Sequence, residues 1–161
     1  MRHTISVLVE NEFGVLSRIS GLFSGRGFNI ESLSVAETID PETSRMTIVT
    51  RGNEQIIEQI KKQLNKLINV IKVVDHAMEQ SVERELILVK VNAESEMRAE
   101  ILRVVDIFRA RVIDLTPKSY TIEMTGDEGK VTALVEMLRP MGIKEIARTG
   151  KIAMGRGAKG L

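Results

Sequence analysis

The chain offers few residues of the type and spacing that catalysis needs. It has 161 residues, no cysteine and two histidines, His3 and His76. A nucleophile or general base needs a partner group within hydrogen-bond reach, and each histidine lies in or beside a segment with a strand pattern. We therefore interpret both as surface or interface residues and expect no catalytic residue, which makes an enzyme the weaker hypothesis.

Metal chemistry is not indicated either. The sequence has no His-Glu-x-x-His pattern and no cysteine pairs, and its acidic residues are dispersed over positions expected to face solvent. We expect no metal site and no cofactor bound by this chain itself.

The most suggestive group of residues is a turn at positions 11–14. Gly14 stands just before a predicted helix, where unpaired backbone N–H groups converge and could hold the carboxylate of an amino acid. Asn11 in the same turn can both donate and accept hydrogen bonds, and Asn29 opens an expected strand nearby. On spacing alone, an ordinary turn glycine and turn asparagine explain the pattern at least as well.

Two other segments compare poorly with this turn as anion sites. Residues 21–27 are rich in glycine, but they end the predicted helix, where the dipole is negative and carbonyls are free. A helix stop is the better interpretation. The turn at residues 92–96 has no glycine and carries two carboxylates. If only one half of the chain binds a small anionic ligand, we expect the first half to do so.

Hydrophobic periodicity predicts the elements that position these turns. In the first half we expect a strand over 4–10, a helix from Val15 to the glycines at 25–27, strands over 28–37 and 44–51, a helix over 53–67 and a strand over 70–78. The second half repeats the pattern with a strand over 86–91, a helical stripe over 97–108, strands over 111–115 and 119–125, a helix over 131–138 and a strand from 142.

The repeated βαββαβ order predicts an α+β fold of two ferredoxin-like domains, each a four-stranded antiparallel sheet with two helices on one face. We place the domains at residues 1–78 and 84–161. The second domain is expected to end in a flexible basic tail, with its positive charges at Arg148, Lys151, Arg156 and Lys159.

Both faces of the strands at 70–74 and 86–89 carry apolar residues, although two helices can cover only one face of such a sheet. The second domain, a symmetry mate or a partner subunit must cover the other face. We expect a homodimer at least.

Composition excludes several classes of function. Apolar residues make up 43% and charged residues 28% of the chain, and the net charge is +1. This balance is typical of a globular protein and gives no steering toward nucleic acid. Four Phe and one Tyr are too few for an RNA-stacking sheet. The N-terminus lacks a signal-peptide pattern and no apolar run could span a bilayer, so we expect a cytoplasmic protein without membrane or nucleic-acid partners.

The chain resembles the small regulatory subunits of acetolactate synthase (acetohydroxyacid synthase), in their full-length two-domain bacterial form. The resemblance is strongest over residues 9–18 (VENEFGVLSR), 21–33 (GLFSGRGFNIESL) and 44–48 (SRMTI). It continues through residues 58–64, 82–86, 107–110, 119–123 and 148–150, and so covers nearly the whole chain.

This resemblance implies an N-terminal ACT domain and a second domain typical of the family, with no catalysis of its own. Such a subunit would bind the thiamine-diphosphate-dependent large subunit, raise its activity and confer feedback inhibition by valine in branched-chain amino acid biosynthesis. Thiamine diphosphate, Mg²⁺ and FAD would belong to the catalytic subunit. The family's effector loop falls on Asn11, Gly14, Val15 and Leu16, with Asn29 and Ile30 supplied by the facing ACT domain of a homodimer.

Some alternatives stay open. A free-standing ACT-type sensor that regulates a different enzyme would use the same Asn11 and Gly14. A small hydrolase of the acylphosphatase kind would need an arginine and an asparagine in an anion loop, for which Arg26 and Asn29 are the available pair. The preference among valine, leucine and isoleucine, the surface that contacts the catalytic subunit and the stoichiometry are not indicated by the sequence.

Overall fold

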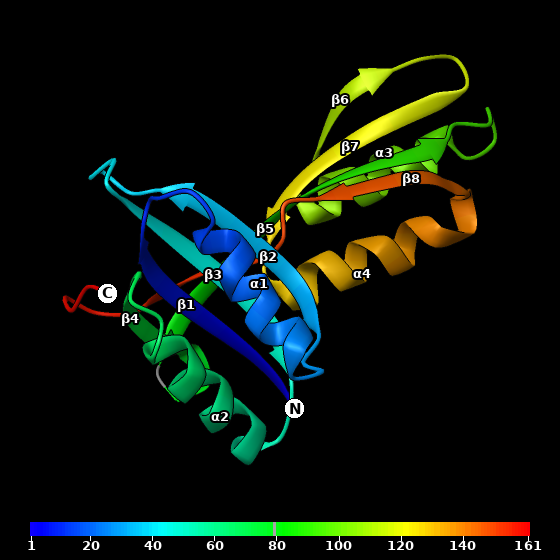
Figure 1. The fold of residues 1–161 in the computed structure, drawn as a ribbon. Helices are drawn as coiled ribbons and strands as arrows, with labels where there is room; N and C mark the ends of the chain where they lie inside the picture. Colours follow the sequence, from blue (N-terminus) through cyan, green and yellow to red (C-terminus); the bar gives the residue numbers. More distant parts are fainter. Residues whose placement is uncertain (79) are drawn as a thin grey trace. The chain divides into compact units, whose positions relative to one another are not determined.

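The computed structural model describes residues 1–78 and 80–161, which form two compact units (Figure 1). The N-terminal unit comprises Met1–Val82 together with Lys151–Leu161, and the C-terminal unit comprises Glu83–Gly150. Among the described residues, no helix has both the length and the apolarity needed to cross a membrane.

The N-terminal unit has the predicted βαββαβ order. Its elements are β1 (Arg2–Glu10), α1 (Val15–Gly25), β2 (Ile30–Glu37), β3 (Thr43–Arg51), α2 (Glu54–Asn65) and β4 (Val70–Asp75), followed by a short 3-10 helix, η1 (His76–Met78). The antiparallel sheet has the strand order β2-β3-β1-β4, and both helices pack on one face of it (Figure 1). The strand β2 is therefore an edge of the sheet.

The core of this unit consists of the alternating apolar residues of the strands and the apolar stripes of the helices, as the sequence predicts. Ile5, Val7 and Val9 of β1 are buried against the helices. The residues that meet them are Val15, Ile19, Leu22 and Phe23 of α1, and Ile57, Ile60 and Leu64 of α2. The second stripe differs slightly from the expected one, because Ile57 is buried while Ile56 is only half-buried, and the helix ends at Asn65. Asn53 begins α2 by accepting a hydrogen bond from the Ile56 N–H at 2.9 Å.

The face of the sheet opposite the helices carries small polar residues. Ser6 and Thr47 are paired in register and alternate with core residues, so they point away from α1 and α2, yet both are buried. Part of their cover is the chain's own C-terminal strand, β9 (Ile152–Gly155), which contacts β1.

This strand corrects the expectation of a flexible tail that belongs to the second domain. The main-chain N–H of Lys151 donates to Ser32 Oγ at 3.1 Å, and the Arg45 guanidinium donates to the Ala153 carbonyl at 2.6 Å. Ala153 is 4% exposed. The small side chains of the sheet leave room for a strand to approach closely, and their hydroxyls offer hydrogen bonds. The positive charge and the glycines of the C-terminal segment suggest flexibility and give no sign of this docking.

The C-terminal unit repeats the architecture. Its elements are β5 (Ser81–Asn92), α3 (Arg98–Phe108), β6 (Arg111–Leu115), β7 (Ser119–Gly126), α4 (Glu128–Leu138), the 3-10 helix η2 (Arg139–Met141) and β8 (Ile143–Arg148). The strand order is β6-β7-β5-β8, and the first residues of β5 belong to the N-terminal unit. Ile87, Val89 and Val91 form the centre of a core shared with α3 and α4. The prediction of two ferredoxin-like units is confirmed.

Candidate functional site

The turn between β1 and α1 is held against the β2–β3 hairpin by Asn11. The Asn11 main-chain N–H donates to the Glu42 carbonyl at 2.7 Å. Its side-chain Nδ2 donates to the Pro41 carbonyl at 2.9 Å and to Glu37 Oε1 at 3.2 Å. Both side-chain N–H groups are thus occupied, while Asn11 Oδ1 accepts no hydrogen bond from the described residues. The amide oxygen remains available for an external donor.

Gly14 shapes the start of α1. Its φ of 79° lies in the left-handed region, and it is the N-cap residue, so no side chain caps the helix. Arg18 N–H bonds to the Gly14 carbonyl, but within the described chain the N–H groups of Leu16 and Ser17 have no main-chain or side-chain acceptor. A Cβ on Gly14 would meet no atom within 4 Å. Leu16 and Ser17 are exposed, so two unpaired amides lie on the surface at the positive end of a helix dipole, which suits a carboxylate.

The other predicted effector residues divide between core and surface. Val15 is 4% exposed and packs in the core, so it can offer only its backbone to a ligand. Leu16 and Phe13 are exposed beside the turn, and Ile39 at the tip of the β2–β3 hairpin is fully exposed. The turn thus has open amides and exposed apolar side chains on the same end of the unit.

Asn29 and Ile30 do not join this group within one chain. They follow the C-terminal end of α1, and an 11-residue helix separates them from Gly14 by about 16 Å along its axis. The Asn29 carbonyl accepts a hydrogen bond from Thr50 Oγ1 at 2.6 Å. A single copy therefore assembles Asn11, Gly14 and Leu16 but not the second half of the expected site.

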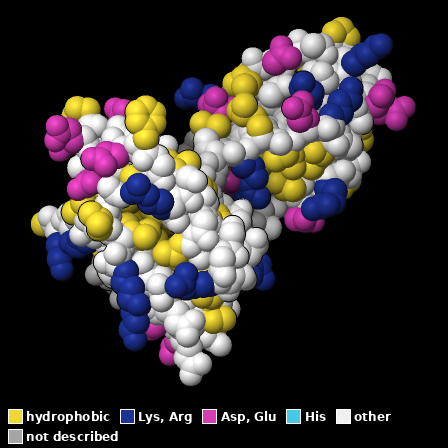
Figure 2. Space-filling view, viewed as in Figure 1, with side chains coloured by type: hydrophobic (Ala, Val, Ile, Leu, Met, Phe, Trp, Pro, Cys, Tyr) yellow, Lys and Arg dark blue, Asp and Glu magenta, His cyan; other side chains and the backbone are white. Residues whose placement is uncertain are grey.

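The two ends of the N-terminal unit carry opposite charge. The hairpin end presents the exposed carboxylates of Glu12, Glu37, Asp40 and Glu42, and Figure 2 shows acidic side chains gathered there beside hydrophobic ones. Asn69 ties two carboxylates of this end together, since its Nδ2 donates to Glu10 Oε2 at 2.9 Å and to Glu12 Oε2 at 3.3 Å. This end favours a ligand's ammonium group, while the helix amides favour its carboxylate.

At the opposite end, arginines dominate. Arg2 Nε lies 2.6 Å from Glu31 Oε2, and Arg51 pairs with the other oxygen of the same carboxylate. The hydrogen bond from Arg2, supported by Arg51, lowers the pKa of Glu31 against the opposing effect of desolvation. Arg26 adds a further cation, bound to Gln63 Oε1 at 2.9 Å.

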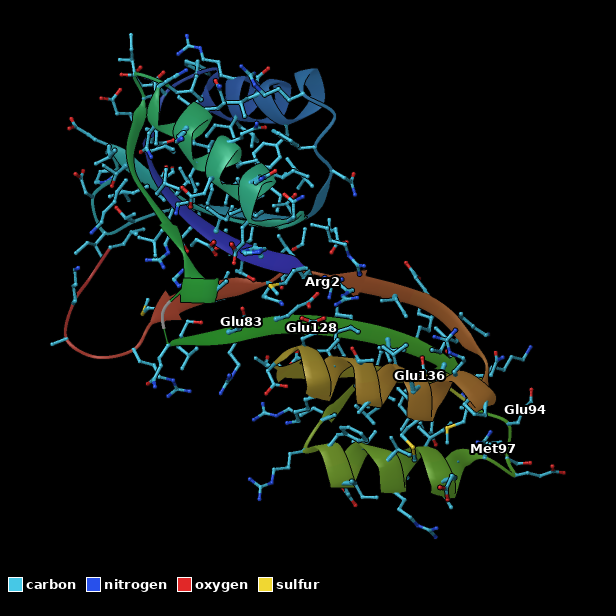
Figure 3. The ribbon with its side chains drawn as sticks, turned by 90° about the horizontal axis from the view of Figure 1, so that it is seen from below. Arg2, Glu83, Glu94, Met97, Glu128 and Glu136 are labelled. Carbon is cyan, nitrogen blue, oxygen red and sulfur yellow. The ribbon has the colours of Figure 1, made fainter. Side chains whose placement is uncertain are left out.

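The equivalent turn of the C-terminal unit offers no such site. Its helix α3 begins at Arg98, and the N-cap residue Met97 makes no side-chain cap hydrogen bond. Glu94 and Met97 lie together at the turn (Figure 3). The Arg98 side chain binds carbonyls on both sides of this turn: Nε donates to the Ala93 carbonyl at 3.0 Å and Nη2 to the Pro117 carbonyl at 2.5 Å. The carboxylates and the absence of a left-handed glycine leave nothing that would hold an anion.

Both histidines are buried, which corrects their interpretation as surface or interface residues. His3 Nδ1 lies 3.0 Å from Asp75 Oδ2, and His76 Nε2 lies 2.7 Å from Ser6 Oγ. Each histidine is 5% exposed, because β1 pairs with β4 and brings residues 75 and 76 alongside the start of the chain. Within the described residues no hydrogen bond joins the two pairs, so they do not form a Ser-His-Asp relay. In the described parts of the chain no three acidic or histidine side chains are grouped to hold a metal.

Comparison with known proteins identifies the family. Residues 5–72 match the model of the AHAS small subunit-like ACT domain, and residues 84–157 match the model of the small subunit of acetolactate synthase. The chain belongs to the acetolactate synthase small subunit family. The N-terminal unit is thus its ACT domain, and the predicted family is confirmed.

The similarity of this small subunit to its relatives extends over the full chain. It is 57% identical to a probable acetolactate synthase small subunit from Archaeoglobus fulgidus over 159 residues, with 99% of each chain covered. It is 53% identical to the small subunit from Mycobacterium bovis, covering 99% of this chain and 95% of the relative. The crystal structure of the small subunit from Thermotoga maritima matches with a TM-score of 0.89 at 42% identity over 99% of both chains. The chain is accordingly a regulatory, non-catalytic subunit.

Proposed function

We propose that this small subunit binds L-valine at the start of α1, and that bound valine inhibits a catalytic large subunit which the small subunit otherwise activates. The observation that carries the proposal is the left-handed Gly14 N-cap, which leaves the Leu16 and Ser17 amides of the first turn without an acceptor. Helix termini with free N–H groups bind carboxylates without a basic side chain.

The groups around the turn match the parts of an aliphatic amino acid. The carboxylate of valine would accept hydrogen bonds from the two amides of α1. Its ammonium group would donate to Asn11 Oδ1, in the acidic surroundings of Glu12 and Glu37. Its branched side chain would contact exposed Leu16. A zwitterion satisfies both the amides and the carboxylates, whereas a simple anion would be repelled by the acidic end.

A second copy would complete the site. Strand β2 is the sheet edge, and edge strands pair readily with another chain. If two copies pair through β2 about a two-fold axis, the strands run antiparallel, so the start of one β2 meets the end of the other. The end of β2 lies beside Asn11, through the bond from Asn11 to Glu37. Asn29 and Ile30 of the second copy would then arrive at the open turn, and its arginine-rich end would face the acidic one.

Inhibition would follow by linkage. Valine bridging two ACT domains favours one dimer arrangement, and the catalytic subunit favours the other. A coupling free energy of about 1–3 kcal/mol changes the affinity or the population by roughly 5- to 150-fold. Thiamine diphosphate, Mg²⁺ and FAD would be held by the catalytic subunit.

Reconstitution tests this proposal. The full chain is mixed with the acetolactate synthase large subunit, and activity is measured with and without L-valine for wild type and for Gly14→Asp. We expect wild type to raise activity and to confer inhibition by valine. The aspartate would occupy the position of the ligand's carboxylate, so the variant should still activate but not respond to valine. Failure of the large subunit to associate would instead favour an ACT sensor of a different enzyme.

A further inference from the structure

A second hollow lies on the other side of the ACT sheet. It has a volume of about 700 Å³ and is bounded by the sheet face opposite the helices and by the C-terminal segment after β9. Figure 1 shows this segment, in red, beside β4. Both walls belong to the N-terminal unit. The amino-acid turn begins α1 on the helix side, so the hollow is a separate place.

Cationic side chains from both walls face the hollow. Arg45 and Lys72 come from β3 and β4, and Arg156 and Lys159 come from the C-terminal segment. Arg45 and Lys72 both oppose Leu8 of β1 in the register, which places them on the same face of the sheet. Four cations are therefore gathered in one concave region.

These cations lack acidic partners among the described residues. No Asp or Glu side chain among residues 1–78 and 80–161 lines the hollow, and none of the four cations forms a salt bridge with these residues. Some cations elsewhere in the chain are neutralised, as Lys61 is by Glu58 and Arg148 by Glu85. Among the described residues that line the hollow, charged side chains are therefore mainly positive.

Arg45 is the anchor of this group. It is half-buried and bonds to neutral oxygens alone, donating to the Ala153 carbonyl at 2.6 Å and to Ser6 Oγ at 3.3 Å. Desolvation by burial lowers its pKa, so the protein holds a charge here without a counter-charge. An anion in the hollow would supply one, and the low dielectric of a partly enclosed site would strengthen the interaction.

We propose that this hollow binds a small anion of the diphosphate class, and that binding fastens residues 156–161 to the ACT sheet. Its volume lies within the range of about 300–1,000 Å³ typical of small-molecule sites. A concave site with cations on opposing walls fits a compact multivalent anion better than a flat protein surface. The ligand would bridge the two walls, because Arg45 and Lys72 belong to the sheet and Arg156 and Lys159 to the C-terminal segment.

Titration calorimetry with sodium pyrophosphate tests the site on the full chain at low ionic strength. We expect saturable binding that weakens as salt is added. Lys72→Gln and Lys159→Gln should each weaken binding about tenfold. These lysines make no hydrogen bond with described residues, so thermal melts should show both variants folded. The matched control is Lys144→Gln, which removes one exposed positive charge from β8 in the other unit.

A second readout reports the position of the C-terminal segment. Hydrogen exchange at residues 156–161 should slow when pyrophosphate is bound, and should not change with L-valine. Gly14→Asp should bind pyrophosphate as wild type does, so this test stands apart from that of the amino-acid site. Absence of pyrophosphate binding, or an equal loss in Lys144→Gln, overturns the proposal. A further outcome would also show that the proposal is wrong: pyrophosphate does not bind, and Lys72→Gln weakens association with the catalytic subunit. The hollow would then bind an acidic protein surface.

Discussion

Asn11 Nδ2 donates to Glu37 Oε1 at 3.2 Å, which joins the turn before α1 to the last residue of the edge strand β2. The open amides of α1 are thereby fixed relative to the edge along which a second copy would pair. In the proposed dimer, this hydrogen bond would connect the ligand-binding turn to the paired edge, so that a change at one could alter the other.

Replacing Asn11 with alanine should weaken valine binding. The change removes the free amide oxygen and the two bonds that hold the β2–β3 hairpin, so we expect about a tenfold loss of affinity. Titration calorimetry of the full chain measures it. Asn65→Ala, at the exposed C-terminal end of α2, is the control and should bind as wild type. Equal affinities for both variants would mean that Asn11 does not contact the ligand.

The Glu31 carboxylate should give the N-terminal unit a pH-dependent stability. Its pKa is lowered in the folded state, chiefly by the hydrogen bond from Arg2. A depressed carboxyl pKa stabilises the fold above the unfolded pKa of about 4.3, and this contribution is lost as the pH falls through the folded pKa. Glu31→Gln should therefore lower the melting temperature at pH 7 but not at pH 2.

The control for this pH profile is Glu94→Gln. Glu94 is exposed in the β5–α3 turn and takes part in no salt bridge within the described chain. Its variant should follow the wild-type melting curve at every pH. A constant difference between Glu31→Gln and wild type from pH 2 to pH 7 would show that the arginines do not stabilise the ionised form.

Much of the fold could be predicted from local patterns, whereas long-range contacts could not. Alternation in β1 and the stripe of α1 each depend on neighbouring residues, and both elements form where periodicity predicts them. The cover supplied by β9 depends on Ala153 meeting a sheet face more than one hundred positions earlier in the chain. In the sequence, β9 is indicated only by a short run of apolar residues after Lys151, and the glycines that follow favour a flexible end instead.

The candidate site divides in the same way. The helix-start glycine and the asparagine of the turn can be found in the sequence, because Gly14 and Asn11 lie within four residues of each other. Ser17 could not be found in this way, since in the proposed site it would contribute its main-chain N–H, and the identity of its side chain gives no sign of that. The burial of His3 was missed as well, because its partner Asp75 comes from a strand at the far end of the unit.

The ion pair between buried Glu85 and Arg148 should stabilise the C-terminal unit. Arg148 binds both oxygens of Glu85, at 2.5 and 2.8 Å, and Glu85 is 5% exposed. Arg148→Met would leave a buried carboxylate without its cation, and should lower the free energy of unfolding by about 2 kcal/mol.

Urea denaturation of the full chain measures this difference, with Arg103→Met as the matched control. Arg103 pairs with Glu100 on the exposed surface of α3, where an ion pair contributes roughly 0.3–0.5 kcal/mol. Similar losses for both variants would indicate that burial of Glu85 adds nothing.

Docking of β9 on the ACT sheet can be tested at adjacent positions. Ala153 is buried and Met154 is exposed, so Ala153→Asp would bury an unpaired carboxylate whereas Met154→Asp would place one in solvent. Hydrogen exchange at residues 151–155 should become fast in the first variant and stay slow in the second. Fast exchange already present in wild type would show that the strand is not docked in solution.

The most direct measurement is a calorimetric titration of L-valine into the full-length small subunit, carried out for wild type, Gly14→Ala and Gly14→Asp, alone and with the catalytic subunit. Alanine introduces left-handed strain without a carboxylate, so its variant should still bind valine. Gly14→Asp should show no saturable heat, because its own carboxylate takes the helix amides. Valine binding by Gly14→Asp with wild-type affinity, or no binding by wild type under either condition, would contradict an amino-acid site at the start of α1.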